Sequence, residues 1–277
     1  MYKNIVFDLY GTLVDIHTDE YKPEFWKKVA DHYARYGAVY DPLQLSQRYG
    51  ELITEQASAM PQGAEVDLGQ VFAELYMEID PTILGLSQTR CEASMDQVSS
   101  VLCGFAIKWL DLSESAQQLI VDTAAAFRRF SMEKLLLFDG VIEMLEGLKQ
   151  AGKKIYLLSN AQALFTRAEL QMTGLEGYFD GILLSSDAGF KKPSREFYGL
   201  LSKRYGLRPE ESLMVGNDDE ADCHGAAAAG IDSLYIFTEQ SPVRKKPLPK
   251  NCWEIQDIRQ VLEHAVRDRR DAVLREK

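Results

Sequence analysis

Four short groups of polar residues along the chain have the composition of a catalytic site. They are Asp8-Leu9-Tyr10-Gly11-Thr12, Ser159-Asn160, Lys192-Pro193, and Gly216-Asn217-Asp218 with Asp222 downstream. A carboxylate such as Asp8 becomes an effective nucleophile when it is aimed at an electrophile whose developing charge is stabilised. The Ser159 hydroxyl and the Lys192 ammonium are groups that would bind an anionic substrate and hold Asp8 ionised. These residue types predict nucleophilic attack by Asp8 on a small anionic molecule.

The last group is acidic enough to suggest a metal site. A hard cation such as Mg2+ prefers oxygen ligands and keeps several of its waters. Asp8, the Tyr10 carbonyl and one or two of Asn217, Asp218 and Asp222 would suffice to bind it. The alternative interpretation of this group is a solvated acidic loop.

The polar groups follow segments that read as buried strands. Short runs rich in β-branched and aromatic residues occupy 4–7, 154–158, 181–184, 212–215 and 233–237. Helical patterns over 141–151 and 194–205 lie between them, with proline at a start and glycine at the ends. This alternation predicts an α/β fold with a Rossmann-like parallel sheet, which binds ligands beyond the carboxyl ends of its strands.

The alternation of strands and helices stops in a long insert. Apolar residues recur at helical spacing in segments over 25–36, 43–60, 68–79, 91–110 and 115–130. More than a hundred residues of helix is too much for one crossover connection. We expect a core domain formed by 1–15 and 133–277 and an all-helical domain over 16–132. The tail over 255–277 reads as a final helix, after a loop over 241–250.

In order and placement, the four polar groups resemble those of the haloacid dehalogenase (HAD) superfamily, whose members often carry a helical cap inserted after the first strand. The resemblance covers about 4–15 and 136–240, while the insert resembles a cap only in placement and pattern. It implies a hydrolase in which Asp8, Ser159 and Lys192 are catalytic. It favours Lys192 over the neighbouring Lys191 as the catalytic lysine, because the family's lysine immediately precedes the proline.

The resemblance also implies a substrate site and a magnesium site. The residues expected to contact substrate are Tyr10, Gly11, Thr12 and Asn160, with Arg128 from the cap. The arginine could reach a carboxylate or phosphate with its forked guanidinium. The expected Mg2+ ligands are Asp8, Tyr10, Asn217, Asp218 and Asp222.

Two positions depart from the pattern of the family's phosphatases. Asn217 stands where an aspartate is common, although an amide oxygen can still bind a metal. Tyr10 stands where a second aspartate usually protonates the leaving group and then activates water. Tyrosine ordinarily titrates near pH 10 and is poorly suited to that task. HAD-type 2-haloacid dehalogenases have tyrosine at this position, and a departing halide needs no proton.

Three functions therefore remain open. The first is a Mg2+-dependent phosphatase acting on a small phosphorylated metabolite. The second is a 2-haloacid dehalogenase, which Tyr10 favours and the acidic fourth group opposes. The third is a binding or regulatory module that lost turnover with Tyr10, which the joint presence of Asp8, Ser159 and Lys192 opposes.

Composition narrows the class of partner. The formal net charge of −11 and pI of about 5.0 argue against nucleic acid or an anionic membrane as the main partner. No apolar run approaches the roughly 20 residues that span a bilayer, and a strand begins too early for a signal peptide. Cys91, Cys103, Cys223 and Cys252 form no close pair in sequence, which is typical of reduced cysteines. We expect a cytoplasmic monomer or homodimer.

Overall fold

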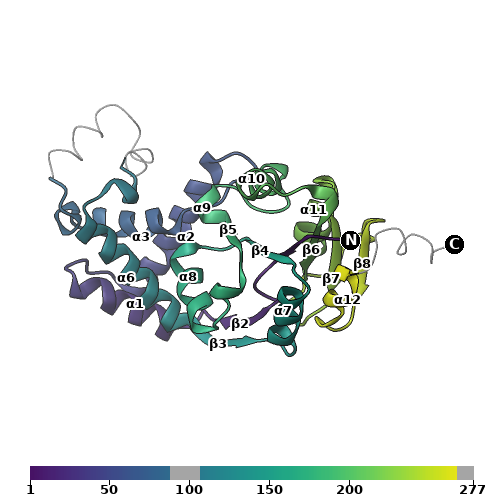
Figure 1. The fold of residues 1–277 in the computed structure, drawn as a ribbon. Helices are drawn as coiled ribbons and strands as arrows, with labels where there is room; N and C mark the ends of the chain where they lie inside the picture. The colour runs from purple at the N-terminus through teal and green to yellow at the C-terminus, as the bar shows by residue number, and fades with distance from the viewer. Residues whose placement is uncertain (88–106, 267–277) are drawn as a thin grey trace. The chain divides into compact units, whose positions relative to one another are not determined.

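The computed structural model describes residues 1–87 and 107–266 (Figure 1). The chain divides into two compact units, one formed by Met1–Ile16 with Lys134–Lys277 and the other by His17–Glu133. Each junction lies one residue beyond the one expected from the sequence.

The first unit is built on a six-stranded sheet in which all pairings are parallel. Its order is β5-β4-β1-β6-β7-β8. The strands are β1 (Asn4–Phe7), β4 (Lys154–Ser159), β5 (Gly181–Leu184), β6 (Ser212–Gly216), β7 (Asp232–Ile236) and β8 (Cys252–Ile255). The central strand β1 pairs with both β4 and β6, so the polar residues that follow these three strands meet at one edge. The Rossmann-like α/β core is confirmed.

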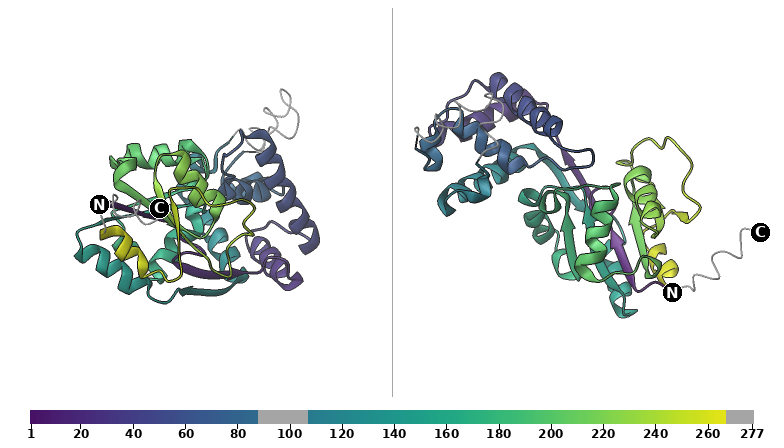
Figure 2. Two further views of the ribbon diagram at one scale, coloured as in Figure 1. Left: turned by 90° about the vertical axis from the view of Figure 1, so that its right-hand side faces the viewer. Right: turned by 90° about the horizontal axis from the view of Figure 1, so that it is seen from above.

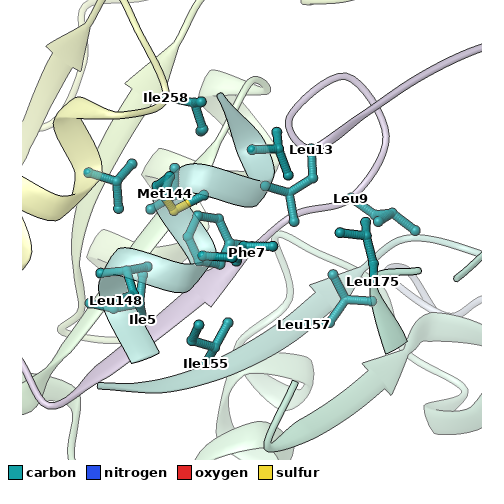
Figure 3. Close-up of a cluster of buried hydrophobic side chains, with 14 of the residues drawn as sticks. Ile5, Phe7, Leu9, Leu13, Met144, Leu148, Ile155, Leu157, Leu175 and Ile258 are labelled. Atoms are coloured by element: carbon teal, nitrogen blue, oxygen red, sulfur yellow. The ribbon is translucent and has the colours of Figure 1, made fainter. Parts of the chain in front are cut away.

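Helices cover both faces of this sheet (Figures 1 and 2). They are α7 (Val141–Gln150), α8 (Ala163–Met172), α9 (Ser185–Ala188), α10 (Arg195–Tyr205), α11 (Gly225–Ala228) and α12 (Gln260–Val266). Successive strand residues point to opposite faces. Ile5 and Phe7 pack in one buried cluster with Met144 and Leu148 of α7 (Figure 3), whereas Val6 packs in the other with residues of α10. The continuous burial of β1 follows from having helices on both sides.

The last strand and the tail differ from the prediction. The sequence predicts a helix from residue 255, but β8 ends at Ile255 and the helix α12 begins only at Gln260. The run Cys-Trp-Glu-Ile is too short to show a two-residue period, and pairing with β7 makes it a strand. The end of the expected tail helix, 267–277, lies outside the described residues.

A second, two-stranded sheet contains the two segments in which the chain passes from one unit to the other. It pairs β2 (Val14–Thr18) with β3 (Met132–Leu137). The sequence analysis missed both strands, and the expected all-helical insert therefore begins and ends in strand. Both strands are partly exposed, so their apolar residues give a weak two-residue pattern beside the strong helical one.

The second unit is helical over most of its described residues. Its helices are α1 (Pro23–Arg35), α2 (Pro42–Ala59), α3 (Leu68–Met77) and α6 (Glu114–Ser131), with short 3-10 turns at Pro81–Leu84 and Trp109–Asp111. Side chains cap three of these helices: Asp41 accepts from Leu43 N and Gln44 N, Asp67 caps α3 in the same way, and Ser113 caps α6. The expected helix over 91–110 lies mostly outside the described residues.

Aromatic rings fill the core of the helical unit. The Phe127 ring lies 4.9 Å from that of Phe25, 5.2 Å from that of Tyr49 and 5.3 Å from that of Phe72, measured between centroids. Such contacts add to the free energy gained by burial alone. Phe25, Trp26 and Tyr33 of α1 are buried, whereas Tyr36, just after the end of α1, is exposed.

Two of the four cysteines lie in the described part of the chain. Cys223 is buried and Cys252 is half-buried, and both are free thiols. Cys91 and Cys103 lie outside it. Within 1–87 and 107–266, no helix combines the length and the apolar character needed to cross a bilayer.

One buried carboxyl makes the stability of the helical unit depend on pH. Glu74 on α3 is only 4% exposed, and its Oε1 accepts a hydrogen bond of 3.1 Å from Gln70 Nε2. Burial raises the pKa of Glu74 from 4.5 to about 7. A carboxyl with a raised pKa contributes stability that is complete below about pH 4.5 and is lost as the pH rises through about 7.

We therefore expect Glu74→Gln to stabilise the helical unit at alkaline pH, because glutamine keeps the acceptor oxygen without its charge. The gain in free energy of unfolding should be larger at about pH 8.5 than at about pH 5.5 by roughly 1–3 kcal/mol. Urea unfolding followed by the fluorescence of Trp26 and Trp109 measures it. Glu114→Gln, at an exposed position of α6, is the matched control and should show no such pH dependence. An equal effect of Glu74→Gln at both pH values would contradict the assignment.

Candidate active site

Asp8 is held at the carboxyl end of the central strand. It follows β1 directly, and its backbone N–H donates to the carbonyl of Val215 on β6 at 2.9 Å. The residue is 8% exposed. The chain then turns at Gly11, whose φ is +79°, and a Cβ there would lie 2.3 Å from Asn217 Nδ2. Glycine is required at this turn both for the left-handed backbone and for the close approach of Asn217.

A buried lysine and a serine bind one oxygen of Asp8. Oδ1 accepts from Lys192 Nζ at 2.6 Å and from Ser159 Oγ at 3.2 Å. The other oxygen, Oδ2, has a longer contact of 3.4 Å with Thr12 Oγ1. The three residues predicted to be catalytic thus meet at one point, and it is Lys192, not Lys191, whose ammonium reaches Asp8. Thr12, which was expected to contact substrate, is buried.

Lys192 is itself fixed by Asn160. The Asn160 amide accepts from the backbone N–H of Lys192 at 2.7 Å and donates to its carbonyl at 3.0 Å. Both ends of the amide therefore bind the backbone beside Pro193. Asn160 was expected to contact substrate; it lines the cavity, and these bonds give it the additional task of positioning the lysine.

Asp222 completes a buried network around the same ammonium. Its Oδ1 accepts from Lys192 Nζ at 2.7 Å, and its Oδ2 accepts from the Asp218 N–H at 3.0 Å. Burial raises the pKa of Asp222 to about 7, although the ammonium of Lys192 lowers it. Burial also lowers the pKa of Lys192, but Asp222 and Asp8 outweigh this effect and the pKa is raised. Lys192 is therefore a cation shared by two carboxyl groups.

The acidic segment after β6 is a π-helix, Asp219–His224, rather than a loop. Asp218 caps it, because its Oδ1 accepts from Glu220 N and Ala221 N at 2.9 Å each. The Tyr198 hydroxyl on α10 donates to the carbonyl of Ala221 at 2.8 Å. These contacts hold Asp218 and Asp222 in place. A π-turn is often found at functional sites, but its irregular period leaves no clear sequence signal.

A cavity of about 280 Å³ opens beside these groups. Its lining residues are Asp8, Tyr10, Ser159, Asn160, Lys192, Asn217, Asp218, Ala221, Asp222, Gln240 and Pro242. Sequence reasoning missed Gln240 and Pro242, which come from the loop after β7. Their position after a strand end was the available signal, because that loop leaves the same edge of the sheet. Gln240 Nε2 donates to Asp15 Oδ1 at 2.6 Å and to the Ile16 carbonyl at 3.0 Å.

The side chain of Tyr10 reaches from this cavity to helix α8. Its hydroxyl donates to Glu169 Oε2 and lies 2.9 Å from Thr166 Oγ1. Glu169 is 3% exposed and Thr166 is fully buried. Neither residue was singled out from the sequence, because both belong to an ordinary amphipathic helix.

Arg128 belongs to the helical unit, near the end of α6. Its charge acts on Glu20 and Tyr49 of the same unit. Its expected contact with substrate remains a prediction.

The residues that could hold a metal are few. In the described part of the chain, no group of three or more histidine, cysteine, aspartate or glutamate residues has the geometry of a metal site. Mg2+ makes smaller demands, because one or two carboxylates with waters are sufficient. Asp8, Asn217 and Asp218 line the cavity and offer oxygens, and the amide oxygen of Asn217 also accepts from Thr12 Oγ1 at 3.2 Å. Both oxygens of Asp222 are already engaged.

The fold and the order of these residues match a known family. A family model described as haloacid dehalogenase-like hydrolase matches residues 2–230. The chain belongs to this family. It is a hydrolase of the HAD superfamily, as the resemblance implied.

Individual sequence relatives include a phosphatase and a putative HAD-hydrolase. The chain is 30% identical over 129 residues to a glyceraldehyde 3-phosphate phosphatase of Methanothermobacter thermautotrophicus, covering 46% of this chain and 57% of the relative. It is 27% identical over 136 residues to the putative HAD-hydrolase YfnB of Bacillus subtilis, covering 49% and 57%. These alignments thus span little more than half of either relative.

Solved structures show the same fold over almost the whole length. A magnesium-bound structure of YfnB covers 96% of this chain and 99% of its own, with a TM-score of 0.50 and 17% identity. The defluorinating L-2-haloacid dehalogenase Rha0230 covers 95% of each chain, with a TM-score of 0.52 and 19% identity. At these identities the likeness establishes the fold alone.

A methyl group at Gly216 would disturb the network around Lys192. A Cβ there would lie 2.0 Å from Asp222 Oδ2, closer than any real contact. We expect Gly216→Ala to displace the Asp222 carboxylate and to lower the free energy of unfolding by about 1–3 kcal/mol. Urea unfolding followed by Trp253 fluorescence measures this change.

The matched control is Gly199→Ala on α10, where an added Cβ meets nothing within 4 Å. It should be neutral or stabilising by up to about 1 kcal/mol, as alanine favours a helix. If Gly216→Ala were as stable as Gly199→Ala, the Asp222 position described above would be wrong.

Proposed function

We propose that the protein is a Mg2+-dependent phosphatase that acts on a small phosphorylated metabolite through an aspartyl-phosphate at Asp8. The observation that supports this most strongly is the contact of Asp8 with Lys192 and Ser159 at the mouth of a cavity that Asp218 also lines. Phosphatases and nucleotidases among the sequence relatives support the same chemistry.

The contacts of Asp8 support different tasks for its two oxygens. Oδ1 is bound by Lys192 and Ser159, whereas Oδ2 makes only a longer contact with Thr12. Oδ2 is therefore the attacking atom. Lys192 and Ser159 lie where they would bind the oxygens of the incoming phosphoryl group. Because Lys192 is buried, its charge acts on the reacting atoms with little screening by water.

A magnesium ion fits the remaining oxygen donors. The ion would be held by Asp8, the Tyr10 carbonyl, Asn217 and Asp218. Asp218 would bind it through its second oxygen and would add a negative charge to the ligand set. When bound, the ion neutralises charge on the transferred phosphoryl group. The magnesium-bound structure of YfnB supports this choice of metal. The chain's own residues would orient the substrate and exclude water.

A second candidate function is 2-haloacid dehalogenation, and Tyr10 is the observation that favours it. In that reaction Oδ2 of Asp8 would form an ester with the substrate carbon while the halide leaves. The acidic residues around Asp218 favour the phosphatase, because halide displacement gives them no task.

Replacing the nucleophile tests the proposal. Asp8→Asn should lower phosphate release from 4-nitrophenyl phosphate to background, because an amide does not attack phosphorus under these conditions. The matched control is Asp187→Asn, at an exposed carboxylate paired with Arg167, which should retain activity. Retained phosphate release by Asp8→Asn would refute the aspartyl-phosphate.

Metal removal separates the two candidates. With 4-nitrophenyl phosphate, EDTA should abolish phosphate release and added Mg2+ should restore it. With 2-chloropropionate, we expect no chloride release. Chloride release that is insensitive to EDTA would instead identify a dehalogenase. Inactivity in both assays would favour a binding module.

A further inference from the structure

The described residues of the site give the leaving group little assistance. A phosphatase normally protonates the departing oxygen with a carboxylic acid and then uses the same group to activate water. Three carboxyl residues line the cavity in the described part of the chain, namely Asp8, Asp218 and Asp222. The first is the proposed nucleophile.

The other two carboxyl groups already have binding partners. Asp222 accepts from Lys192 with one oxygen and from the Asp218 N–H with the other. Asp218 Oδ1 accepts two backbone N–H groups at the start of the π-helix. Its second oxygen is the one proposed to bind the metal. Neither residue is arranged to donate a proton to substrate.

Among the residues that line the cavity, Tyr10 is the nearest in sequence to the proposed nucleophile, but its hydroxyl proton is directed to helix α8. The hydroxyl donates to Glu169 on α8, with Thr166 also in contact. Both partners are buried residues of α8, so this helix holds the hydroxyl. A hydroxyl that donates to a carboxylate cannot donate the same proton to a leaving group.

We propose that the substrates are phosphoryl compounds whose leaving group departs as a stable anion without a proton, namely acyl phosphates or phosphoanhydrides rather than alkyl phosphate esters. This inference rests on the proposed phosphatase function and defines its substrate class. Carboxylate and phosphate leaving groups share the chemistry that the site requires.

The atoms balance without an acid in the first step. Oδ2 of Asp8 bonds to phosphorus, the bond from phosphorus to the bridging oxygen breaks, and that oxygen leaves with the electron pair as a carboxylate or phosphate. In the second step water adds to phosphorus and the bond to Oδ2 breaks. Asp8 is regenerated as a carboxylate, and both protons of the water leave with the inorganic phosphate.

The missing base has a kinetic consequence. Because none of the cavity groups in 1–87 and 107–266 is placed to activate water, we expect the second step to be slow and common to all substrates. The value of kcat should therefore be similar for every reactive substrate, with a burst of leaving group in the first turnover. Differences between leaving groups should appear in kcat/KM, which reports the first step.

The test compares leaving groups in the Mg2+-loaded, full-length protein. The probes are acetyl phosphate, 4-nitrophenyl phosphate, phenyl phosphate and glycerol phosphate, in order of increasingly poor leaving groups. A positioned acid contributes about 10²–10⁴-fold, so kcat/KM for acetyl phosphate should exceed that for glycerol phosphate by at least about 100-fold. Pyrophosphate in place of acetyl phosphate distinguishes the phosphoanhydride from the acyl phosphate.

Variants at Tyr10 test whether this residue determines the dependence of kcat/KM on the leaving group. In Tyr10→Phe the dependence of kcat/KM on the leaving group should keep the wild-type slope, because the hydroxyl does not donate to substrate. In Tyr10→Asp the slope should become shallower, with the largest gain for glycerol phosphate. A shallow slope in the wild-type protein that steepens in Tyr10→Phe would overturn the proposal and make Tyr10 the acid.

Failure of this inference is distinguishable from failure of the proposed function. Equal kcat/KM for acetyl phosphate and glycerol phosphate, with phosphate release still dependent on Mg2+ and Asp8, would refute the substrate class and leave the phosphatase intact. No phosphate release from any probe would refute both.

Discussion

The ammonium of Lys192 is the group around which the site is organised. It lies 2.6 Å from Asp8 Oδ1 and 2.7 Å from Asp222 Oδ1, and it is almost fully buried. A buried charge is stable only when it is paired and hydrogen-bonded, so the lysine and its two carboxylates require one another. Asn160 fixes the lysine backbone, and Gly216 leaves room for Asp222. The network aims Asp8 at the cavity and compensates part of its charge.

Tyr10 shows how a change at one position redirects the same scaffold. The strand, the glycine turn and Asp8, the proposed nucleophile, follow the HAD pattern, but the side chain two residues after Asp8 is bound to α8 through Glu169 and Thr166. In the proposed mechanism, Tyr10 provides no acid for the leaving group, while Lys192 still neutralises charge on the phosphoryl group. The expected result is selectivity for leaving groups that need no proton. Such selectivity explains why acidic residues like those of a phosphatase occur together with a tyrosine like that of a dehalogenase.

The meeting of Asp8, Ser159 and Lys192 could be predicted because each follows or precedes an element with a strong local pattern. Parallel topology then brings strand ends together without further information. The partners of Tyr10 could not be predicted, since Thr166 lies 156 residues away on a helix whose facing side depends on packing. The pair β2 and β3 was missed for a related reason: each strand is half-exposed, and pairing with the other makes it a strand. The helices of the insert could be predicted from their apolar spacing, but the packing of the helical core could not.

The most direct test of this account is to find where phosphate becomes attached during turnover. Acid quenching of the Mg2+-loaded protein during reaction with acetyl phosphate, followed by peptide mass spectrometry, locates the phosphoryl group. We predict a phosphorylated peptide containing Asp8, formed within the first turnover and absent from Asp8→Asn. A phosphoryl group on another residue, or steady turnover with no phosphorylated protein at any time, would contradict the central role of Asp8.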